Sequence, residues 1–385
     1  MPDIEVFLCA LLREEQSAWP SGQDEGFAET FLARADYHGV LPLLHHVLKL
    51  EWARPLGWPA DVLEACHQQA IARTMWELRH QQLLGRVIEA LKQVGIQPVL
   101  FKGTALAYSL YANPVMRARG DTDFIIPPQT LDAVAEVLAA CGFERDTGVE
   151  GEVVNYQASF VRQENSEGNH VLDVHWRINN SQILAKLFTY EELLSKSIPL
   201  PRLSPHARAV SATHALLLAC MHRATHKQNP YYVDGTAYYS GDRLVWIYDV
   251  HLLAAGFSRR DWDGLVRMAQ EKGLCAVCME GFNLSRTYFR TEIPDFVLAA
   301  LKGHEKTETV ARYFDSGAWG QQWMDFCAIP GVSGKLRFLA ETLFPPADYM
   351  RKKYPQARPG WLVWLYIRRA VGGTFKRLSR QAKTT

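Results

Sequence analysis

The chain has 385 residues, 48% of them hydrophobic and 22% charged, which is ordinary for a globular protein with a substantial core. The formal net charge of +1 indicates no class of partner. Seven thinly spread cysteines exclude a disulfide framework and favour a reducing compartment. The start, MPDIEVFLCALLREE, lacks the positive charge of an export signal, and the longest late apolar run, Trp361 to Ile367, is too short to span a bilayer. We therefore expect a cytoplasmic protein of two or three structural units.

Residues 1–95 form the first predicted region, and it is helical. Apolar residues recur at spacings of three and four in its first half, which is the period of an amphipathic helix. The stretch from about residue 60 to 94 contains no proline and predicts one long helix that ends at Gly95.

Residues 96–204 form the second predicted region, a small α/β core. Short apolar or β-branched runs bounded by glycine, proline or polar turns predict strands, and amphipathic runs between them predict helices. The last two strands, separated by a polar turn, are typical of a hairpin. The expected strands are 96–103, 121–126, 153–163 and 170–178, and the expected helices are 104–111 and 129–142.

Residues 205–385 form the third predicted region and return to helical patterns, the clearest at 206–226, 243–255 and 258–273. The predicted fold is therefore α+β, with a small mixed sheet flanked by N-terminal and C-terminal helical regions.

A strand-to-helix turn in the core carries Lys102, Gly103 and Thr104. Glycine at such a turn allows close approach of a phosphate, and the free N–H groups of the helix start attract anions. Turns of this kind are common, so the tripeptide alone does not indicate a function.

Two acids, Asp121 and Asp123, open the next strand and point to one of its faces, because side chains alternate along a strand. Adjacent carboxylates repel each other unless a cation neutralises them, and hard divalent ions prefer carboxylate oxygen. A solvated turn with two acids is the alternative interpretation of the pair.

Asp173 lies on a later, otherwise apolar strand, where it shares a face with His175. An acid in that setting needs either a basic partner or a metal ion. A structural ion pair and a metal ligand both remain open for Asp173 from its own surroundings.

Together these motifs resemble the DNA polymerase beta-like nucleotidyltransferases, and in particular the uncharacterised NTP_transf_5 family. The resemblance covers about residues 97–180 and rests on a KG turn, a tyrosine-containing helix, an RxxxDxD strand start and a DxHW strand. Here these are Lys102-Gly103, Tyr108 or Tyr111, Arg117 with Asp121 and Asp123, and Asp173-His175-Trp176.

The resemblance implies a reaction in which a nucleoside monophosphate passes from an NTP to an acceptor, with Mg²⁺ or Mn²⁺ held by Asp121, Asp123 and Asp173. It makes Asp173 the residue that activates the acceptor hydroxyl. Lys102, Gly103, Thr104, Arg117 and Arg119 are the candidates for binding the nucleotide, and each basic residue could equally be a solvated charge. The wider superfamily has Gly-Gly or Gly-Ser nearer to the first acid, whereas this chain has Gly-Thr farther away.

Polar residues on the later apolar helices and strands are candidates for an acceptor or base pocket. They are His175, His222, His226, Arg243 and Asp249. His222 and His226 share a helix face, so a zinc site with Asp249 and plain helix packing are the competing interpretations. Cys275 and Cys278 form a single CxxC, which we interpret as buried thiols.

The segment from Arg351 to Thr385 holds ten Lys and Arg and no Asp or Glu, beside Trp and Leu residues. It could contact a membrane surface or RNA, or it could pack on the body with a basic outer face.

The predicted function is metal-dependent nucleotidyl transfer from an NTP. The acceptor stays open between a small molecule, a tRNA and a protein or peptide. One rival is a glycosyltransferase that uses DxD to bind a sugar nucleotide, but that class expects a larger α/β domain. The other rival is a non-catalytic binding or regulatory module with the same fold, against which the presence of all three carboxylates argues.

Overall fold

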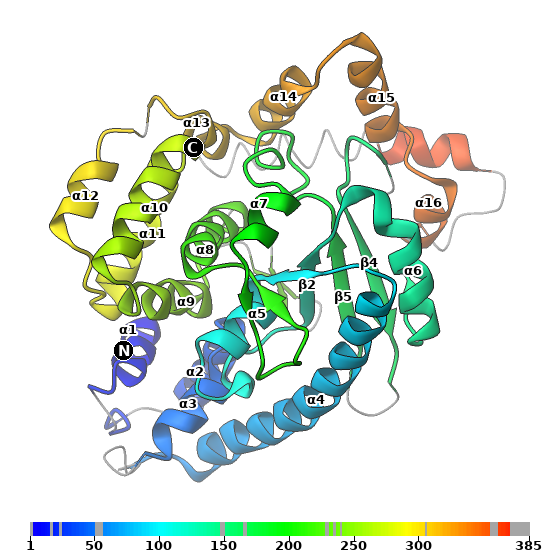
Figure 1. Ribbon diagram of the computed structural model, residues 1–385. Coiled ribbons are helices and arrows are strands. Elements are labelled where there is room, and N and C mark those ends of the chain that lie inside the picture. The colour runs from blue at the N-terminus through cyan, green and yellow to red at the C-terminus, as the bar shows by residue number, and fades with distance from the viewer. Residues whose placement is uncertain are drawn as a thin grey trace.

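A computed structural model describes residues 3–369 except 16–17, 23–24, 51–56, 147–150, 165–167, 228–230, 234–235, 239–240, 305 and 355–360. One mixed sheet lies at the centre, with helices on both of its faces (Figure 1). This is the predicted α+β architecture of a small mixed sheet with flanking helices.

The N-terminal region is helical, as predicted. Its helices are α1 (Ile4–Leu12), α2 (Glu25–Tyr37), α3 (Leu41–Leu48) and α4 (Ala60–Gln93). Asp3 caps α1 by accepting hydrogen bonds from the backbone N–H groups of Glu5 and Val6. The 34-residue α4 runs along the sheet (Figure 1), and Gly95 follows it with a positive φ of 78°, which only glycine adopts readily.

The central sheet has seven strands in the order β3-β4-β5-β2-β1-β7-β6. They are β1 (Val99–Phe101), β2 (Asp121–Ile125), β3 (Glu144–Arg145), β4 (Gln157–Arg162), β5 (His170–His175), β6 (Ile198–Pro199) and β7 (Arg208–Ala209). Strand β2 pairs in parallel with β5 and antiparallel with β1, while β4 and β5 form the predicted antiparallel pair. Helices α5 (Lys102–Ser109), α6 (Leu131–Ala140) and α7 (Tyr190–Ser195) and the 3₁₀ turns Pro114–Met116 and Pro128–Thr130 connect the strands.

One correction concerns the start of the third region. The sequence predicts a helix from 206, but Arg208–Ala209 is the strand β7, which lies between β1 and β6, and the helix α8 begins at Ala212. The N–H of Val210 donates to the carbonyl oxygen of Leu100, so this short segment supplies hydrogen-bond partners to the backbone of β1 on the side away from β2.

The rest of the described chain is mainly helical. Its helices are α8 (Ala212–His226), α9 (Leu244–Ala255), α10 (Arg259–Lys272), α11 (Cys275–Phe289), α12 (Asp295–Leu301), α13 (Thr309–Asp315), α14 (Ala318–Ala328), α15 (Val332–Leu343) and α16 (Ala347–Lys353). Residues 362–369 are also helical. A small hairpin of β8 (Tyr231–Val233) and β9 (Thr236–Tyr238) follows α8. Within the described residues, no helix combines the length and apolar character needed to cross a membrane.

The two faces of the sheet bury different cores. Phe124 and Leu172 pack with residues of α4 and α6, whereas Phe101 and Ile125 pack with residues of α8 and the later helices. A third core joins α1, α2 and α3 to α9. Side-chain alternation along β2 therefore directs Asp121 and Asp123 to the side of α8 and Thr122 to the side of α4.

Candidate functional site

Three carboxylates meet where β2 and β5 run side by side. In the parallel register of the two strands, Asp123 lies directly opposite Asp173, and Asp121 precedes Asp123 by two residues on the same face. Neighbouring strands are about 4.8 Å apart, so backbone pairing alone holds these acids close together.

Lys102 supplies a positive charge to this group. Its Nζ lies 2.6 Å from Oδ1 of Asp123, and its side chain is partly open to solvent. Lys102 has a φ of +58°, a conformation that costs a non-glycine residue about 1–3 kcal/mol. The strained turn between β1 and α5 thus aims an ammonium group at the carboxylates.

His175 completes the group from the end of β5. Its Nε2 lies 2.9 Å from Oδ1 of Asp123, and both side chains are buried. Burial alone would raise the pKa of Asp123, but the Lys102 ammonium and the hydrogen bond with His175 hold it below its ordinary value. Both partners therefore favour the ionised form of Asp123.

The other two acids titrate differently. The side chain of Asp121 still reaches solvent, yet the surrounding protein and the carboxylates of Asp123 and Asp173 raise its pKa to about 7. Burial and the charge of Asp123 also raise the pKa of Asp173, although Ser159 donates a 2.6 Å hydrogen bond to it. The protein thus carries more negative charge here than Lys102 balances.

The donor set fits a divalent cation. One ligand atom each of Asp123, Asp173 and His175 lies within 4.8 Å of the others. Carboxylate oxygens suit Mg²⁺ and Mn²⁺. Asp121 is not a member of this close group, and His175, which the sequence assigned to an acceptor pocket, takes its place.

Arg117 does not face these carboxylates as a free phosphate ligand. Its Nε and Nη2 lie 2.9 and 2.7 Å from the two carboxylate oxygens of Asp249, and its Nη1 donates to the carbonyl of Ala118. Tyr111 donates a further hydrogen bond to Asp249. Because both charged groups are buried, each needs the other as its partner. The nucleotide role expected for Arg117 and the pocket role expected for Asp249 stay predictions.

Arg119 and Thr104 lie on the opposite side of β2. The Nη2 of Arg119 is 2.6 Å from Oε1 of Glu77 on α4, and its Nε donates to Oγ1 of Thr104. Thr104 also bonds Thr122, which bonds His80. These buried side chains satisfy one another, and the nucleotide contacts expected for Arg119 and Thr104 stay a prediction.

Gly103 lies between these two settings. A Cβ built on it would lie 3.4 Å from Cδ of Arg119, an ordinary packing distance, and its φ is not positive. The unusual backbone of the KG turn therefore belongs to Lys102.

Two adjoining small hollows that open to solvent lie between Lys102 and the helices α8 and α9. Lys102, Leu218 and His222 line both hollows. Trp246 also lines the first hollow, and His226 also lines the second. The His222 ring centroid lies 4.5 Å from that of His226 and 5.1 Å from that of Trp246. Burial and His226 lower the pKa of His222, so its ring is neutral near pH 7.

Arg243 was expected to line this cleft, but it is not among the residues that line the two hollows. Its Nε donates to the carbonyl oxygen of Tyr37, and its guanidinium lies against Gly39, so it ties α9 to the N-terminal helices. The Arg117–Asp249 pair forms part of the wall of the first hollow. Within the described residues, no group of three close ligand atoms includes His222 or His226, which leaves the zinc interpretation without support.

The profile of the NTP_transf_5 family, described as uncharacterised nucleotidyltransferases, matches residues 25–290 of the chain. The chain belongs to this family. A search of curated proteins gives no match. Among solved structures, the solution structure of the antibiotic-resistance factor ANT(2'')-Ia aligns with 54% of this chain and 98% of its own, at 12% identity and a TM-score of 0.34. That likeness is too distant to carry an argument about function.

Family membership supports a transferase of the nucleotidyl-transferring kind, and such enzymes usually use a divalent metal. The matched segment contains the whole central sheet together with α8 and α9. It therefore includes both the carboxylate group and the two hollows beside it.

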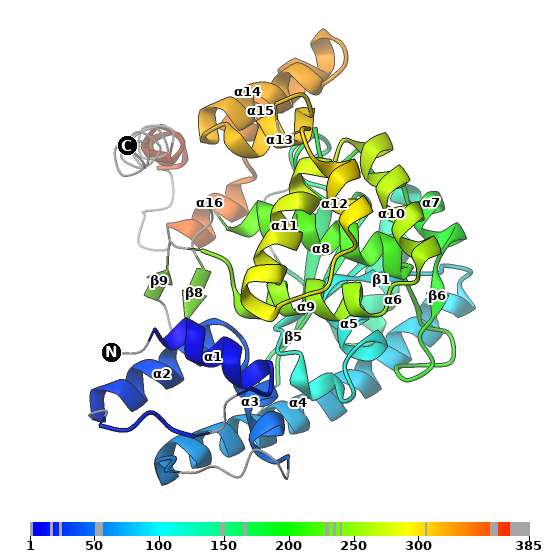
Figure 2. The ribbon, with the colours of Figure 1, turned by 90° about the vertical axis from the view of Figure 1, so that its left-hand side faces the viewer.

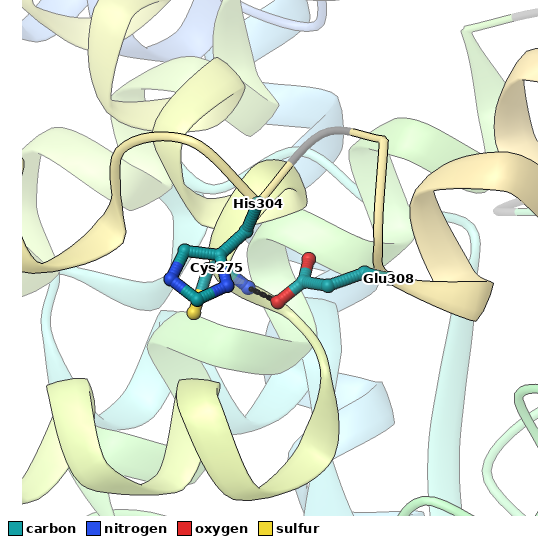
Figure 3. A group of neighbouring side chains, drawn as sticks. All are labelled: Cys275, His304 and Glu308. Carbon is teal, nitrogen blue, oxygen red and sulfur yellow. Dashed lines mark hydrogen bonds between the residues drawn. The ribbon is translucent and has the colours of Figure 1, made fainter.

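This family member has a second group of three close ligand atoms, from Cys275, His304 and Glu308 (Figure 3). The Glu308 carboxylate accepts hydrogen bonds from the backbone N–H groups of Cys275 and Ala276, at 2.8 and 2.9 Å, and so caps α11. Burial and Glu308 raise the pKa of Cys275 to about 12, so its thiol stays protonated. Cys275 and Cys278 are buried free thiols, as predicted, and Glu308 has a structural task.

Proposed function

We propose that this protein transfers a nucleoside monophosphate from an NTP to an acceptor hydroxyl or phosphate and releases pyrophosphate. The observation that carries the proposal is the parallel register of Asp123 and Asp173, with His175 beside them and more negative charge than Lys102 balances. Family membership supports the same class of reaction.

We assign Asp123, Asp173 and His175 as the residues that hold Mg²⁺ or Mn²⁺, with Asp121 at the solvent side of the same face. When bound, the cation would neutralise charge on the phosphates and make the acceptor oxygen a better nucleophile. In the transfer, the acceptor oxygen bonds to the α-phosphorus, the bond to pyrophosphate breaks, and a carboxylate oxygen of Asp173 takes the acceptor proton.

Lys102 is the residue assigned to the triphosphate. Its ammonium partners Asp123 in the structure, and a divalent cation on the same carboxylate would release it. The strained turn places the freed ammonium at the start of α5, whose free N–H groups also favour an anion.

The hollows beside Lys102 are the proposed place for the nucleoside or the acceptor. Trp246 and the neutral ring of His222 offer flat surfaces on which a base can stack. His222→Ala should retain affinity for the triphosphate and lose transfer if this wall binds the acceptor. Loss of NTP affinity would place the base there instead.

The direct test incubates the full-length protein and Mg²⁺ with each α-labelled NTP in a lysate of its host. Label should enter one size fraction of the lysate, which identifies the acceptor as small molecule, RNA or protein. Asp123→Asn should give none, and Asp348→Asn, at an exposed carboxylate, should match the wild type. Transfer of a γ-label or of a sugar label would contradict nucleotidyl transfer, and NTP binding without any transfer would indicate a binding module. A cytoplasmic location stays a prediction that rests on the free cysteines.

A further inference from the structure

Exposed apolar side chains are concentrated in one late part of the chain. Of the seventeen large hydrophobic residues that are exposed in the described structure, eleven lie between Trp319 and Ile367. This part follows the segment that matches the family profile, and Figures 1 and 2 show α14 and α15 at the periphery of the molecule.

Helix α15 carries the clearest pattern. Its exposed apolar residues are Val332, Leu336, Leu339 and Leu343, spaced by four, three and four residues, so they form one stripe. The other side of α15 meets the body, because Arg337 pairs with Glu152 and Glu341 accepts hydrogen bonds from the N–H groups of Glu152 and Val153. The helix is therefore fixed with its apolar stripe outward, the reverse of a normal surface helix.

The helix at 362–369 continues this surface. Tyr366 donates to the carbonyl of Pro345 and Arg369 to that of Thr342, which fastens the helix to the end of α15. Val363, Trp364 and Ile367 of this helix are exposed, and Leu365 is buried. The two apolar stripes thus belong to one connected unit.

The sequence around this unit is mainly basic, and exposed acids beside it, such as Asp348 and Glu152, pair with Arg351 and Arg337. From Arg351 to the C-terminus the sequence holds ten Lys and Arg and no acid. The acids of α14 and α15 turn toward the body, since Asp325 accepts from Ser181 and Glu341 from residues 152–153. A basic surface that also exposes Trp and Leu is complementary to an anionic lipid surface.

We propose that α15 and the helix at 362–369, the docking unit, bind the surface of an anionic membrane. RNA would gain charge contacts but little from a Val and Leu stripe, because aliphatic side chains neither stack on bases nor bond to them. A second copy would bring two basic surfaces together, which like charges oppose. At the boundary between lipid headgroups and acyl chains, aliphatic side chains, Trp and basic residues all contribute favourably to binding.

The test is flotation of the full-length protein with phosphatidylcholine vesicles that contain or lack phosphatidylglycerol. The protein should float with the anionic vesicles, and Leu336→Ser with Leu339→Ser should lower its partition coefficient at least about tenfold, as two apolar side chains are lost. The matched control, Ile71→Ser with Leu78→Ser, removes two exposed apolar residues from α4 and should partition like the wild type. Circular dichroism melts of both variants should overlay the wild type, since all four residues are exposed.

Failure to float, or an equal loss in the control, would overturn the proposal. So would a concentration-dependent dimer, or binding to a mixed RNA, that the Leu336 and Leu339 changes abolish. The proposal is independent of nucleotidyl transfer, because these changes lie outside the carboxylate site and should leave NTP binding as it is.

Discussion

The two faces of strand β2 hold polar residues in opposite ways. On the α4 face, Thr122 belongs to a network in which Arg119 pairs with Glu77 and each hydroxyl has a partner. On the α8 face, Asp121 and Asp123 join Asp173, and Lys102 is the residue that supplies a paired ammonium.

The difference separates a structural site from a functional one. Buried polar groups that satisfy one another stabilise a single packing arrangement, and they leave nothing for a ligand to do. Carboxylates that repel one another lower the stability of the fold, and such groups are found mainly at sites that bind a cation or a substrate. Changes on the α8 face should therefore alter activity, and changes on the α4 face should alter stability.

The largest effect is expected from Asp123→Asn. Loss of a cation ligand removes several kcal/mol of transition-state stabilisation, so transfer from an α-labelled NTP should fall about 10³-fold. The melting temperature should fall only modestly, because the loss of the ionised partner of Lys102 and His175 is partly offset by the loss of repulsion with Asp121 and Asp173. Transfer at near wild-type rate with saturating Mg²⁺ would contradict the assigned role.

Arg119→Met should show the reverse pattern. It leaves Glu77 buried without its partner, so the free energy of unfolding measured in urea should fall by about 3–5 kcal/mol. Where the variant is folded, its affinity for NTP should match that of the wild type. Arg351→Met, at an exposed ion pair, should cost about 0.5 kcal/mol or less. Unchanged stability together with lost NTP binding would show that Arg119 contacts the nucleotide.

Asp121→Asn should raise stability at high pH. The pKa of Asp121 is raised to about 7 in the folded protein, so ionisation between about pH 4 and 7 favours the unfolded chain. In EDTA, thermal melts at pH 8 should give the variant a higher melting temperature than the wild type, and the two should converge near pH 4. A variant that is less stable at pH 8 would show that the Asp121 carboxylate is stabilising.

On the α4 face, His80 should make the free energy of unfolding fall as the pH falls, which is the opposite sign to Asp121, and the effect should be smaller. Burial, Arg119 and His170 lower the pKa of His80, so protonation favours the unfolded chain, and its stability contribution is lost as the pH falls below about 6.5. His80→Gln should reduce the slope of unfolding free energy against pH between 6.5 and 5, measured by urea titration. An equal slope in both proteins would assign the acid sensitivity to other groups.

The sequence predicted the order of strands and helices well where apolar periodicity runs for several residues, as in α4, β2 and β5. It missed β3, β6 and β7, because two-residue strands have no period to detect. It placed Asp173 and His175 on one strand face, but the contact of His175 with Asp123 depends on the register between strands, which one sequence does not reveal.

The basic residues show the same limit more sharply. Arg117 and Arg119 precede the DxD motif, and the family resemblance made both of them candidates for phosphate binding, with a solvated charge as the alternative. Their partners Asp249 and Glu77 lie 132 and 42 residues away along the chain, on α9 and α4. Only the folded arrangement of those helices shows that the two charges are already neutralised.

The central claim is that the α8 face of β2 and β5 holds a divalent cation with a nucleotide. Anomalous scattering from crystals grown with Mn²⁺ and a non-hydrolysable NTP tests it most directly. We predict a manganese peak about 2.0–2.6 Å from carboxylate oxygens of Asp123 and Asp173, with the triphosphate beside Lys102. A nucleotide bound elsewhere, or a main peak at Cys275, His304 and Glu308 with none at the aspartates, would contradict the account.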